Sequence, residues 1–492
     1  MNDYIIINDN DNVAVALRPF SKGEVIHGVT LLDDVPQAHK VALVDIKQGE
    51  DIIKYGSPIG HATKDILAGN HVHVQNTKTN LNDVFDYEYT PDFCDVKTIN
   101  KEKTVDVYDR GNGEYGIRNE LWIVQLVGCV SGNAHQIINA FKAQYDTSAI
   151  DGVYTFNHPF GCSQMGSDHN MTKTYLQNMV KHPNAGGVLV LGLGCENNQM
   201  KAFMETLGEY NKERVRTLVC QEVEDEVSAG VELLKELYDV MKDDVRTTHP
   251  VSVLRVGLKC GGSDGMSGIT ANPLLGKFSD YMALNGGTTV LGEVPEMFGA
   301  EHLLMARSKD EETFKKVVDL VNDFKIYFKN HDQVIYENPS PGNKKGGITT
   351  LEDKSLGCTQ KSGSAAVKGV LSYGQVVETP GLNLLSAPGN DLVASTALAA
   401  SGSHIVLFTT GRGTPFASPV PTVKISSNSP LANKKQNWID FNSGVLVEDA
   451  EMEETAQKFF DYIIEVASGK KVCSEEAGFH DDMAIFKQGV TL

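Results

Sequence analysis

The sequence has little of what marks secreted, membrane-spanning or disulfide-stabilised proteins. Its 492 residues include 8 cysteines and 2 tryptophans, and the cysteines are scattered rather than spaced as a disulfide framework. No apolar run approaches the roughly 18 residues that a membrane span requires. The N-terminal stretch MNDYIIINDNDN lacks the basic and apolar regions of a secretory signal. These absences predict a reduced, cytoplasmic protein that does not enter a membrane.

Positive charge is also scarce. The chain has 44 Lys and Arg against 64 Asp and Glu, a formal net charge of −20. This balance argues against nucleic acid and anionic membrane surfaces as partners. No GxGxxG follows a clean strand and no GxxxxGK[ST] is present, so we expect no nicotinamide cofactor. A small anionic substrate remains compatible, provided that local cations or a metal ion meet it.

The residues that are present predict an α/β protein with a small β-rich module at its start. Residues 1–90 hold several short apolar runs separated by glycine turns, which favours a compact, barrel-like β module. Residues 91–104 carry a proline and many charges without periodicity, as a linker would. In residues 105–247 and 248–492, fully apolar strands alternate with amphipathic helices, which predicts mainly parallel sheets in two further domains. The oligomeric state stays open, a homodimer included.

The stretch from Gly69 to Leu81, GNHVHVQNTKTNL, is the strongest local signal. Polar and apolar residues alternate through His71, Val72 and His73, so both histidines should point to the same face of a strand. Positions two apart on a strand lie about 6–7 Å from each other, close enough for two imidazoles to hold one divalent ion. The alternative is a solvated strand face that happens to carry two histidines.

A second pattern is an apolar run followed by Cys beside Gly and then a helix. It occurs at Gly128-Cys129, at Gly194-Cys195 and at Lys259-Cys260-Gly261. In a parallel sheet such turns lie at the carboxyl ends of the strands, where helix N-termini favour anions. Each turn could equally be a tight bend with a small buried side chain. Thiolates bind iron or zinc well, but the absence of a CxxC pair weighs against a metal cluster.

Two polar segments add candidate residues. The loop from Asn157 to His169, NHPFGCSQMGSDH, is rich in glycine and polar side chains and follows a predicted strand, as site loops often do. A helix-capping turn is the alternative. Arg118, with Asn119, lies in a glycine-rich turn, and its guanidinium could bind a substrate carboxylate through two hydrogen bonds. The alternative is that Arg118 forms an exposed salt bridge.

Together these stretches resemble the altronate/galactarate dehydratase family over essentially the full length. The segments that carry the resemblance are DNVAVAL (11–17), AHKVAL (38–43), IKYGSPIG (53–60), HVHVQNTKTNL (71–81), YGIRNELWIV (115–124), HPFGCSQMG (158–166), VLGLGCE (190–196) and LKCGGSDGMSGITANP (258–273). The resemblance implies an N-terminal SAF-type β module, dependence on Fe²⁺ or a similar divalent ion such as Mn²⁺, and conversion of D-altronate to 2-dehydro-3-deoxy-D-gluconate and water. The whole-length match favours altronate over galactarate.

Such a dehydration removes the proton at C2, beside a carboxylate, and then the hydroxyl at C3. A divalent ion on the carboxylate offsets charge in the deprotonated intermediate, and a base tuned near neutrality takes the proton. From spacing we assign the ion to His71 and His73, completed by Cys162 or His158. The acid and base candidates are His39, Lys54, His158 and His169, and the substrate-binding candidates are Arg118, Asn119, Lys259, Ser263 and Asp264.

Two alternatives remain open at this stage. The substrate could be galactarate or a related sulfonated hydroxy acid. The N-terminal module could instead be a carbohydrate-binding or regulatory domain beside a site that lies wholly in the larger region. A pure binding protein is disfavoured, because the clustered polar loops exceed what binding alone requires.

Overall fold

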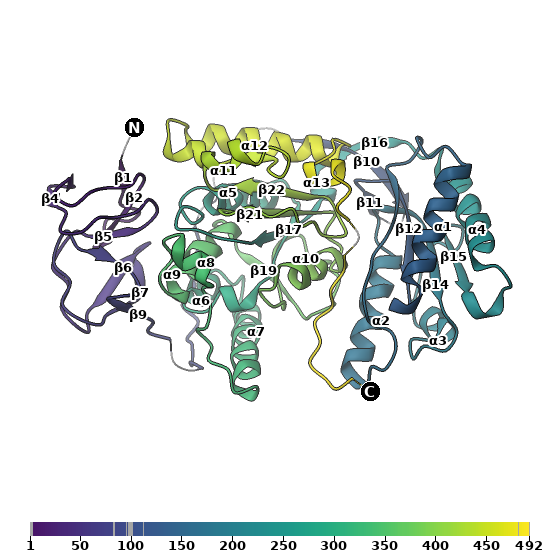
Figure 1. Cartoon of the computed structure of the whole chain (residues 1–492), viewed down its shortest axis with the longest axis horizontal. Coiled ribbons are helices and arrows are strands. Elements are labelled where there is room, and N and C mark those ends of the chain that lie inside the picture. The colour runs from purple at the N-terminus through teal and green to yellow at the C-terminus, as the bar shows by residue number, and fades with distance from the viewer. Residues whose placement is uncertain are drawn as a thin grey trace.

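The computed structural model describes residues 3–81, 84–94, 96, 102–111, 113–480 and 482–491. The expected fold class is confirmed: a β-rich N-terminal module (residues 3–81) precedes a larger α/β region whose two main sheets are parallel. We call residues 104–250 the second domain and residues 251–480 the central domain. Figure 1 shows the central domain between the N-terminal module on one side and the second domain on the other.

The N-terminal module consists of short antiparallel strands. Its sheets have the orders β1-β2-β5-β8 and β6-β7-β9, beside the hairpin β3-β4. The strands are β1 Tyr4–Ile5, β2 Val13–Ala16, β3 Val25–Ile26, β4 Val29–Thr30, β5 Lys40–Ala42, β6 Asp51–Lys54, β7 Ser57–Ala62, β8 His71–Val72 and β9 Thr77–Lys78. The histidine strand is shorter than its alternation predicts: it ends at Val72, because the His73 N–H turns to the Asn76 Oδ1 at 2.9 Å.

The second domain has a four-stranded parallel sheet in the order β13-β12-β14-β15. Leu121 and Ile123 of β12 pack toward α1 and α4, whereas Trp122 and Val124 pack into a separate core on the other face. A continuous apolar strand therefore supplies both faces of the sheet. The elements are β10 Thr104–Gly111, β11 Glu114–Gly116, β12 Glu120–Gln125, η1 Gly128–Val130, α1 Ser131–Gln144, β13 Gly152–Thr155, α2 Gly166–Val180, β14 Ala185–Gly192, α3 Met200–Glu205, β15 Val215–Val219, η2 Cys220–Glu222, α4 Glu226–Met241 and β16 Arg246–Pro250.

The central domain has a seven-stranded parallel sheet in the order β19-β20-β18-β17-β21-β22-β23. The helices α5, α7 and α12 contribute to its largest core. Its elements are η3 Val251–Val253, β17 Arg255–Cys260, α5 Ala271–Leu284, β18 Thr288–Leu291, η4 Val294–Glu296, α6 Glu301–Ala306, α7 Glu311–Asn330, α8 Pro341–Lys345, α9 Leu351–Thr359, η5 Gln360–Ser362, β19 Val367–Leu371, β20 Gly381–Leu385, α10 Asp391–Ala400, β21 Ile405–Thr410, β22 Thr422–Ser426, α11 Ser429–Lys434, β23 Phe441–Asn442, η6 Gly444–Val447, α12 Met452–Ala467 and α13 Cys473–Glu476. No described helix is long and apolar enough to cross a membrane.

Two chain segments join the domains. Residues 84–94 run along the central domain, where the Tyr89 hydroxyl donates to the Ser308 carbonyl at 2.7 Å. Part of the predicted linker, residues 95 and 97–101, lies outside the described residues. Residues 482–491, the C-terminal tail, return to the second domain and form a β-bridge between Gln164 and Thr491.

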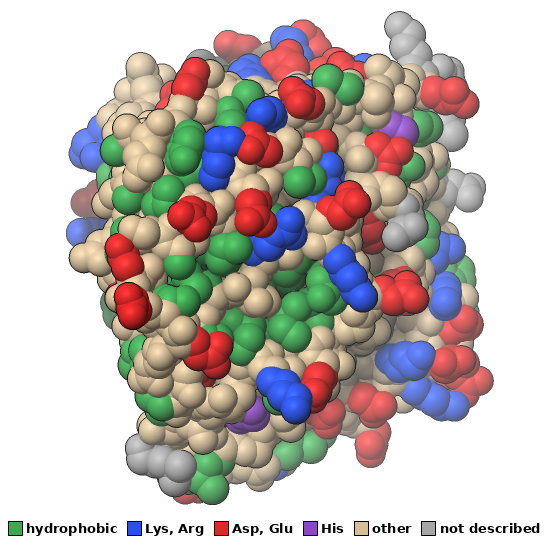
Figure 2. Space-filling model, turned by 90° about the vertical axis from the view of Figure 1, so that its right-hand side faces the viewer, with side chains coloured by type: hydrophobic (Ala, Val, Ile, Leu, Met, Phe, Trp, Pro, Cys, Tyr) green, Lys and Arg blue, Asp and Glu red, His purple; other side chains and the backbone are tan. Residues whose placement is uncertain are grey.

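The end of the molecule formed by the second domain is shown in Figure 2. Hydrophobic side chains gather near the middle of this face, and acidic and basic side chains are interspersed around them. Nucleic-acid-binding surfaces collect Lys and Arg on one face instead. The described side chains of this face show no such continuous basic area.

We expect the buried ion pair between Arg118 and Glu475 to hold the second and central domains together. The guanidinium donates to both carboxylate oxygens at 2.7 and 2.8 Å, and both side chains are at least 96% buried. Arg118→Met should therefore destabilise the protein by about 3–5 kcal/mol, measured by chemical denaturation. Lys235→Ala, which removes an exposed pair with Asp239, should change stability by only about 0.5 kcal/mol. Equal effects of the two variants would contradict this role.

Candidate active site

Three histidines of the N-terminal module meet where it contacts the central domain. Their ring centroids are 4.7 to 5.7 Å apart, and His39 Nδ1 lies 3.0 Å from His71 Nε2. His73 Nδ1 lies 3.1 Å from the Thr349 hydroxyl of the central domain. Burial is the main cause that lowers the pKa of His71 to about 4 and of His73 to about 3. All three imidazoles are therefore held in the neutral form at pH 7, as either proton acceptors or metal ligands require.

A single carboxylate joins two lysines beside these histidines. Asp353 of α9 accepts from Lys40 at 2.8 Å and from Lys54 at 3.0 Å, and all three side chains are at least 98% buried. Burial lowers the pKa of Lys40 to about 8, although Asp353 opposes this shift. Burial would also lower the pKa of Lys54, but the attraction of Asp353 outweighs burial and raises the pKa of Lys54 above its usual value. The two lysines thus differ in how readily they release a proton.

Close backbone approach lets the module dock this tightly. A Cβ on Gly347 would lie 2.2 Å from the Ala38 carbonyl oxygen, and a Cβ on Gly265 would lie 2.3 Å from the same atom. Both positions therefore require glycine. Thr350 accepts from the Asp353 N–H and caps α9, which fixes Asp353 in the first turn of that helix opposite the two lysines.

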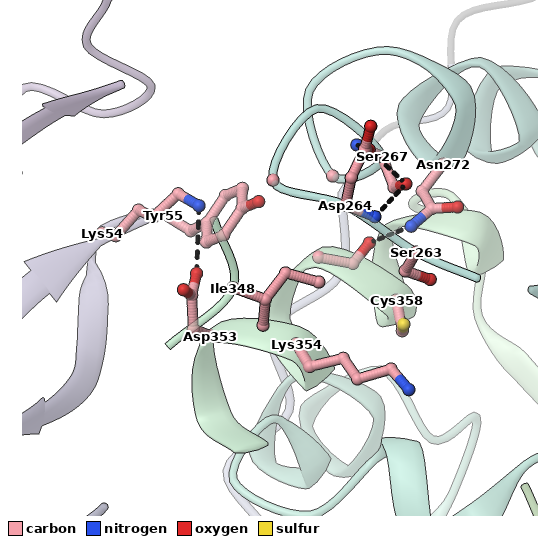
Figure 3. A pocket seen from close by; sticks show the side chains of 13 residues that line it. Lys54, Tyr55, Ser263, Asp264, Ser267, Asn272, Ile348, Asp353, Lys354 and Cys358 are labelled. Carbon is pink, nitrogen blue, oxygen red and sulfur yellow. Dashed lines mark hydrogen bonds and ion pairs between the residues drawn. The ribbon is translucent and has the colours of Figure 1, made fainter. Parts of the chain in front are cut away.

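A small pocket opens beside the docked face, as Figure 3 shows. Lys54 and Tyr55 of the module line one side of it. The other side comes from the turn after β17 and from α9. The lining includes three of the predicted residues, Lys54, Ser263 and Asp264, together with Asp353, Lys354 and Cys358. The pocket therefore spans the interface between the module and the central domain, and Cys358 connects it to a second group of side chains.

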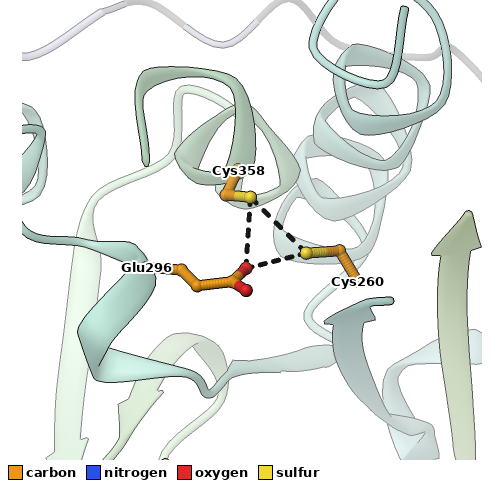
Figure 4. Close-up of side chains that lie close together, drawn as sticks. All are labelled: Cys260, Glu296 and Cys358. Carbon is orange, nitrogen blue, oxygen red and sulfur yellow. Dashed lines mark hydrogen bonds between the residues drawn. The ribbon is translucent and has the colours of Figure 1, made fainter. Parts of the chain in front are cut away.

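That second group is a buried triad of Cys260, Glu296 and Cys358, shown in Figure 4. Both thiols donate to Glu296 Oε2, from Cys260 at 2.7 Å and from Cys358 at 3.2 Å, and the two sulfurs are 3.4 Å apart. Among the described residues, this is the one group of at least three His, Cys, Asp or Glu side chains whose ligand atoms all lie within 4.8 Å of one another. Two thiolates and a carboxylate suit iron or zinc.

The charges around the triad also suit a divalent cation. Three lysines form ion pairs with three carboxylates, so the positive and negative charges around the triad balance. The lysines are Lys259, Lys354 and Lys361, and the carboxylates are those of Glu293, Glu296 and Asp391. Binding of a divalent ion with loss of both thiol protons would leave this balance unchanged. Burial by itself would raise the pKa of Glu296, but the three lysines outweigh burial and lower the pKa below its usual value. The carboxylate is therefore ionised and can bind a cation.

Several predicted site residues lie elsewhere or are fully engaged. Arg118 and Asn119 precede the start of β12, and Asn119 is held by Asp151 and Met241. They are therefore far from the carboxyl ends of the strands. Lys259 is paired with Glu293 and Asp391. None of these three residues lines the pocket.

Asp264 lines the pocket but is held by the fold. It accepts from the Ser267 N–H at 2.9 Å, from the Ser427 hydroxyl at 2.9 Å and from the Asn428 amide at 3.2 Å. Ser263 donates to the Cys260 sulfur at 3.3 Å. Asp264 therefore shapes the turn after β17, and Ser263 belongs to the surroundings of the triad.

The remaining candidates belong to the second domain, on the opposite side of the central domain from the module (Figure 1). His158 is buried and lies 2.9 Å from the Gln125 carbonyl. His169 belongs to α2, and Cys162 is exposed in the loop before that helix. The structure therefore gathers His39, Lys54, His71 and His73 but does not bring Cys162, His158 or His169 to them.

The sequence did not indicate the triad or the ion pairs of Asp353 with Lys40 and Lys54. Cys260, Glu296 and Cys358 are up to 98 positions apart along the chain, and no spacing motif joins them. Lys40 is next to His39, at the start of a strand that the sequence predicts to be apolar. Asp353 resembles any acidic residue in the first turn of a helix. The one usable signal was the cysteine next to glycine after the apolar strand β17.

Comparison with known proteins agrees with this architecture. Three family models match: the altronate/galactarate dehydratase SAF domain at residues 2–80, the second domain of D-galactarate dehydratase/altronate hydrolase at 107–242, and the C-terminal domain of D-galactarate/altronate dehydratase at 251–491. The chain is 58% identical to altronate dehydratase of Escherichia coli (strain K12), with 99% of this chain and 100% of the relative covered. The chain belongs to the altronate/galactarate dehydratase family.

Other relatives outline the range of this dehydratase family. Altronate dehydratase of Bacillus subtilis (strain 168) is 56% identical, with 100% of both chains covered. Galactarate dehydratase (L-threo-forming) of Escherichia coli (strain K12) is 33% identical, with 98% of this chain and 96% of the relative covered. Identity is therefore much higher to the two altronate dehydratases than to the galactarate dehydratase.

The histidine cluster should make stability depend on pH. Between about pH 6.5 and 4, unfolded histidines bind protons that folded His71 and His73 do not. The free energy of unfolding should therefore fall as the pH falls through this window. The His71→Gln/His73→Gln double variant should show a shallower pH dependence in urea denaturation. A wild-type slope in the double variant would contradict the argument.

Proposed function

We propose that this protein is an altronate dehydratase, a hydro-lyase that converts D-altronate to 2-dehydro-3-deoxy-D-gluconate and water. The observation that carries the proposal is the full-length similarity to two altronate dehydratases at 58% and 56% identity. Support also comes from the neutral histidines and the lysine pair at the interface between the module and the central domain, and from the metal-suited triad inside the central domain next to the pocket. We further propose that the reaction takes place in a reduced cytoplasm.

The chemical difficulty lies at C2 of the sugar acid. Removing this proton places a second negative charge next to the carboxylate, so the intermediate needs compensating positive charge. Lys54 retains its proton because of Asp353 and lines the pocket. We assign its ammonium to the substrate carboxylate.

The proton transfers fall to the histidine cluster. His39 and His71 lie 3.0 Å apart through ring nitrogens, so a proton taken by one imidazole can be shared with the other. A neutral imidazole is a suitable base for the C2 proton, and its protonated form can then donate to the departing C3 hydroxyl. These two transfers leave the imidazole neutral, as it was at the start.

We place the divalent ion at Cys260, Glu296 and Cys358. An ion bound there would act as a Lewis acid toward oxygen atoms of the substrate. The two thiols favour Fe²⁺ over Mn²⁺, because thiolate is a soft ligand. The donor set of His71, His73 and Cys162 is less suitable, because Cys162 belongs to the second domain and His73 Nδ1 is engaged by Thr349.

Substitutions should separate the two donor sets. Cys358→Ser should lose activity together with the iron that is not matched by acid-labile sulfide, measured by iron and sulfide analysis of protein purified without oxygen. His71→Gln should keep the iron but lower kcat about 10²–10⁴-fold, as expected for loss of an acid–base residue. If His71→Gln loses the iron and Cys358→Ser keeps it, the ion belongs to the histidines instead.

Substrate identity is tested directly by turnover. Protein incubated with Fe²⁺ in the absence of oxygen should dehydrate D-altronate with a higher kcat/KM than galactarate, and a chelator should abolish this activity. A sulfonated hydroxy acid belongs in the same panel, because the chain is 27% identical to (2R)-sulfolactate sulfo-lyase subunit beta of Chromohalobacter salexigens over 77% of this chain and 97% of that subunit. A preference for galactarate or (2R)-sulfolactate would overturn the assignment.

The N-terminal module could instead serve only to bind carbohydrate or to regulate. The burial of Lys40 and Lys54 against Asp353 favours a direct part in the site. Lys54→Met in the full chain should raise KM for D-altronate strongly, whereas Lys47→Met, which removes an exposed lysine of the same module, should not. Unchanged kinetics in Lys54→Met would support the regulatory interpretation.

A further inference from the structure

The carboxyl edge of the second domain's sheet carries a set of cysteines that the proposed reaction does not use. Cys129 follows β12, Cys162 follows β13, and Cys195 follows β14. These are three adjacent strands, β13-β12-β14, and all are parallel. Their carboxyl ends therefore lie at the same edge, which is where open α/β sheets bind ligands.

The loops that hold these cysteines are in direct contact. The Gly128 N–H donates to the Phe160 carbonyl at 2.9 Å, which joins the loop of Cys129 to that of Cys162. A Cβ on Gly161 would lie 2.0 Å from the Leu126 carbonyl oxygen, so the same two loops touch through their backbones.

The third loop joins the other two. The Asn198 N–H donates to the Gly161 carbonyl at 3.0 Å, and the Ser163 N–H donates to the Asn197 side chain at 2.7 Å. Asn198 also donates to the Leu126 carbonyl at 3.3 Å. These contacts bring the three loops that carry the cysteines together at one edge of the sheet.

The surroundings of this edge favour negative charge. All three thiols are exposed, although free cysteines are among the residues most often buried. The helices α1 and α2 begin at this edge, and their N-cap residues, Val130 and Met165, provide no side-chain cap. Their first-turn N–H groups and positive dipole ends are therefore available to anionic groups such as thiolates.

We propose that Cys129, Cys162 and Cys195 bind an iron–sulfur cluster. Within the described residues, only the Cys260 triad brings three such ligand atoms within 4.8 Å of one another, so the three thiols are not arranged for one mononuclear ion. A cluster places sulfide-bridged iron atoms between its cysteines and so accepts thiolates that are further apart. Three cysteines would leave one iron of a four-iron cluster without a protein thiolate. This site is independent of the proposed dehydration and of the triad.

Reconstitution of the full chain tests the proposal. Protein treated with equal amounts of ferrous and ferric iron and with sulfide in the absence of oxygen, then desalted, should retain about four acid-labile sulfides per chain with a broad visible absorption band, and about four irons beyond the one proposed for the triad. Cys129→Ser, Cys162→Ser and Cys195→Ser should each lose most of the sulfide and of the absorption. Cys94→Ser, at an exposed cysteine outside the set, and Cys260→Ser should both retain them.

Several outcomes would overturn the proposal of a cluster. Wild-type protein that binds no labile sulfide would do so, as would a triple serine variant that binds as much as wild type. Binding of zinc or of a single iron by these thiols, without sulfide, would replace the cluster by a mononuclear site. A circular dichroism spectrum and a thermal unfolding midpoint equal to those of wild type would show that each serine variant is folded. We expect this result because the thiols are at the surface.

Discussion

The carboxylate of Asp353, shared between Lys40 and Lys54, is the contact on which the rest of the candidate site depends. It joins a small β module to a separate domain through fully buried charges. Removing one partner of such a group leaves another charge buried without compensation, which costs far more than the pair contributes. The bridge therefore fixes the position of the module, and with it the position of three histidines over the turn that follows β17.

In the proposed reaction, this arrangement divides the chemistry between the module and the central domain. The module contributes the imidazoles and the lysines, and the central domain contributes the triad and most of the pocket wall. A site built in this way needs close backbone contact, which Gly265 and Gly347 permit. The second domain takes no part in the pocket, and the exposed thiols at its own sheet edge are the basis of the separate site that we propose.

Much of the fold could be predicted because it depends on local pattern. Continuous apolar runs such as that of β12 identify buried parallel strands, and the amphipathic pattern of α12 identifies a surface helix. The histidine strand was predicted too long, because the Asn76 side chain captures the His73 N–H and ends the pairing. The candidate site was predicted only in part, since His71 and His73 are neighbours in sequence, whereas Glu296 and Asp353 have no local signature.

The sequence by itself determined the class of the fold, the sites of the cysteine turns and the family that the chain resembles, because periodicity and short motifs are properties of neighbouring residues. Only the tertiary structure decided which of those turns face one another. It brought Cys260 to Cys358, put the loops of Cys129, Cys162 and Cys195 in contact, and engaged Arg118 in an ion pair with Glu475. The physical reason is that strand order and domain docking, which bring distant residues together, depend on the packing of the whole chain.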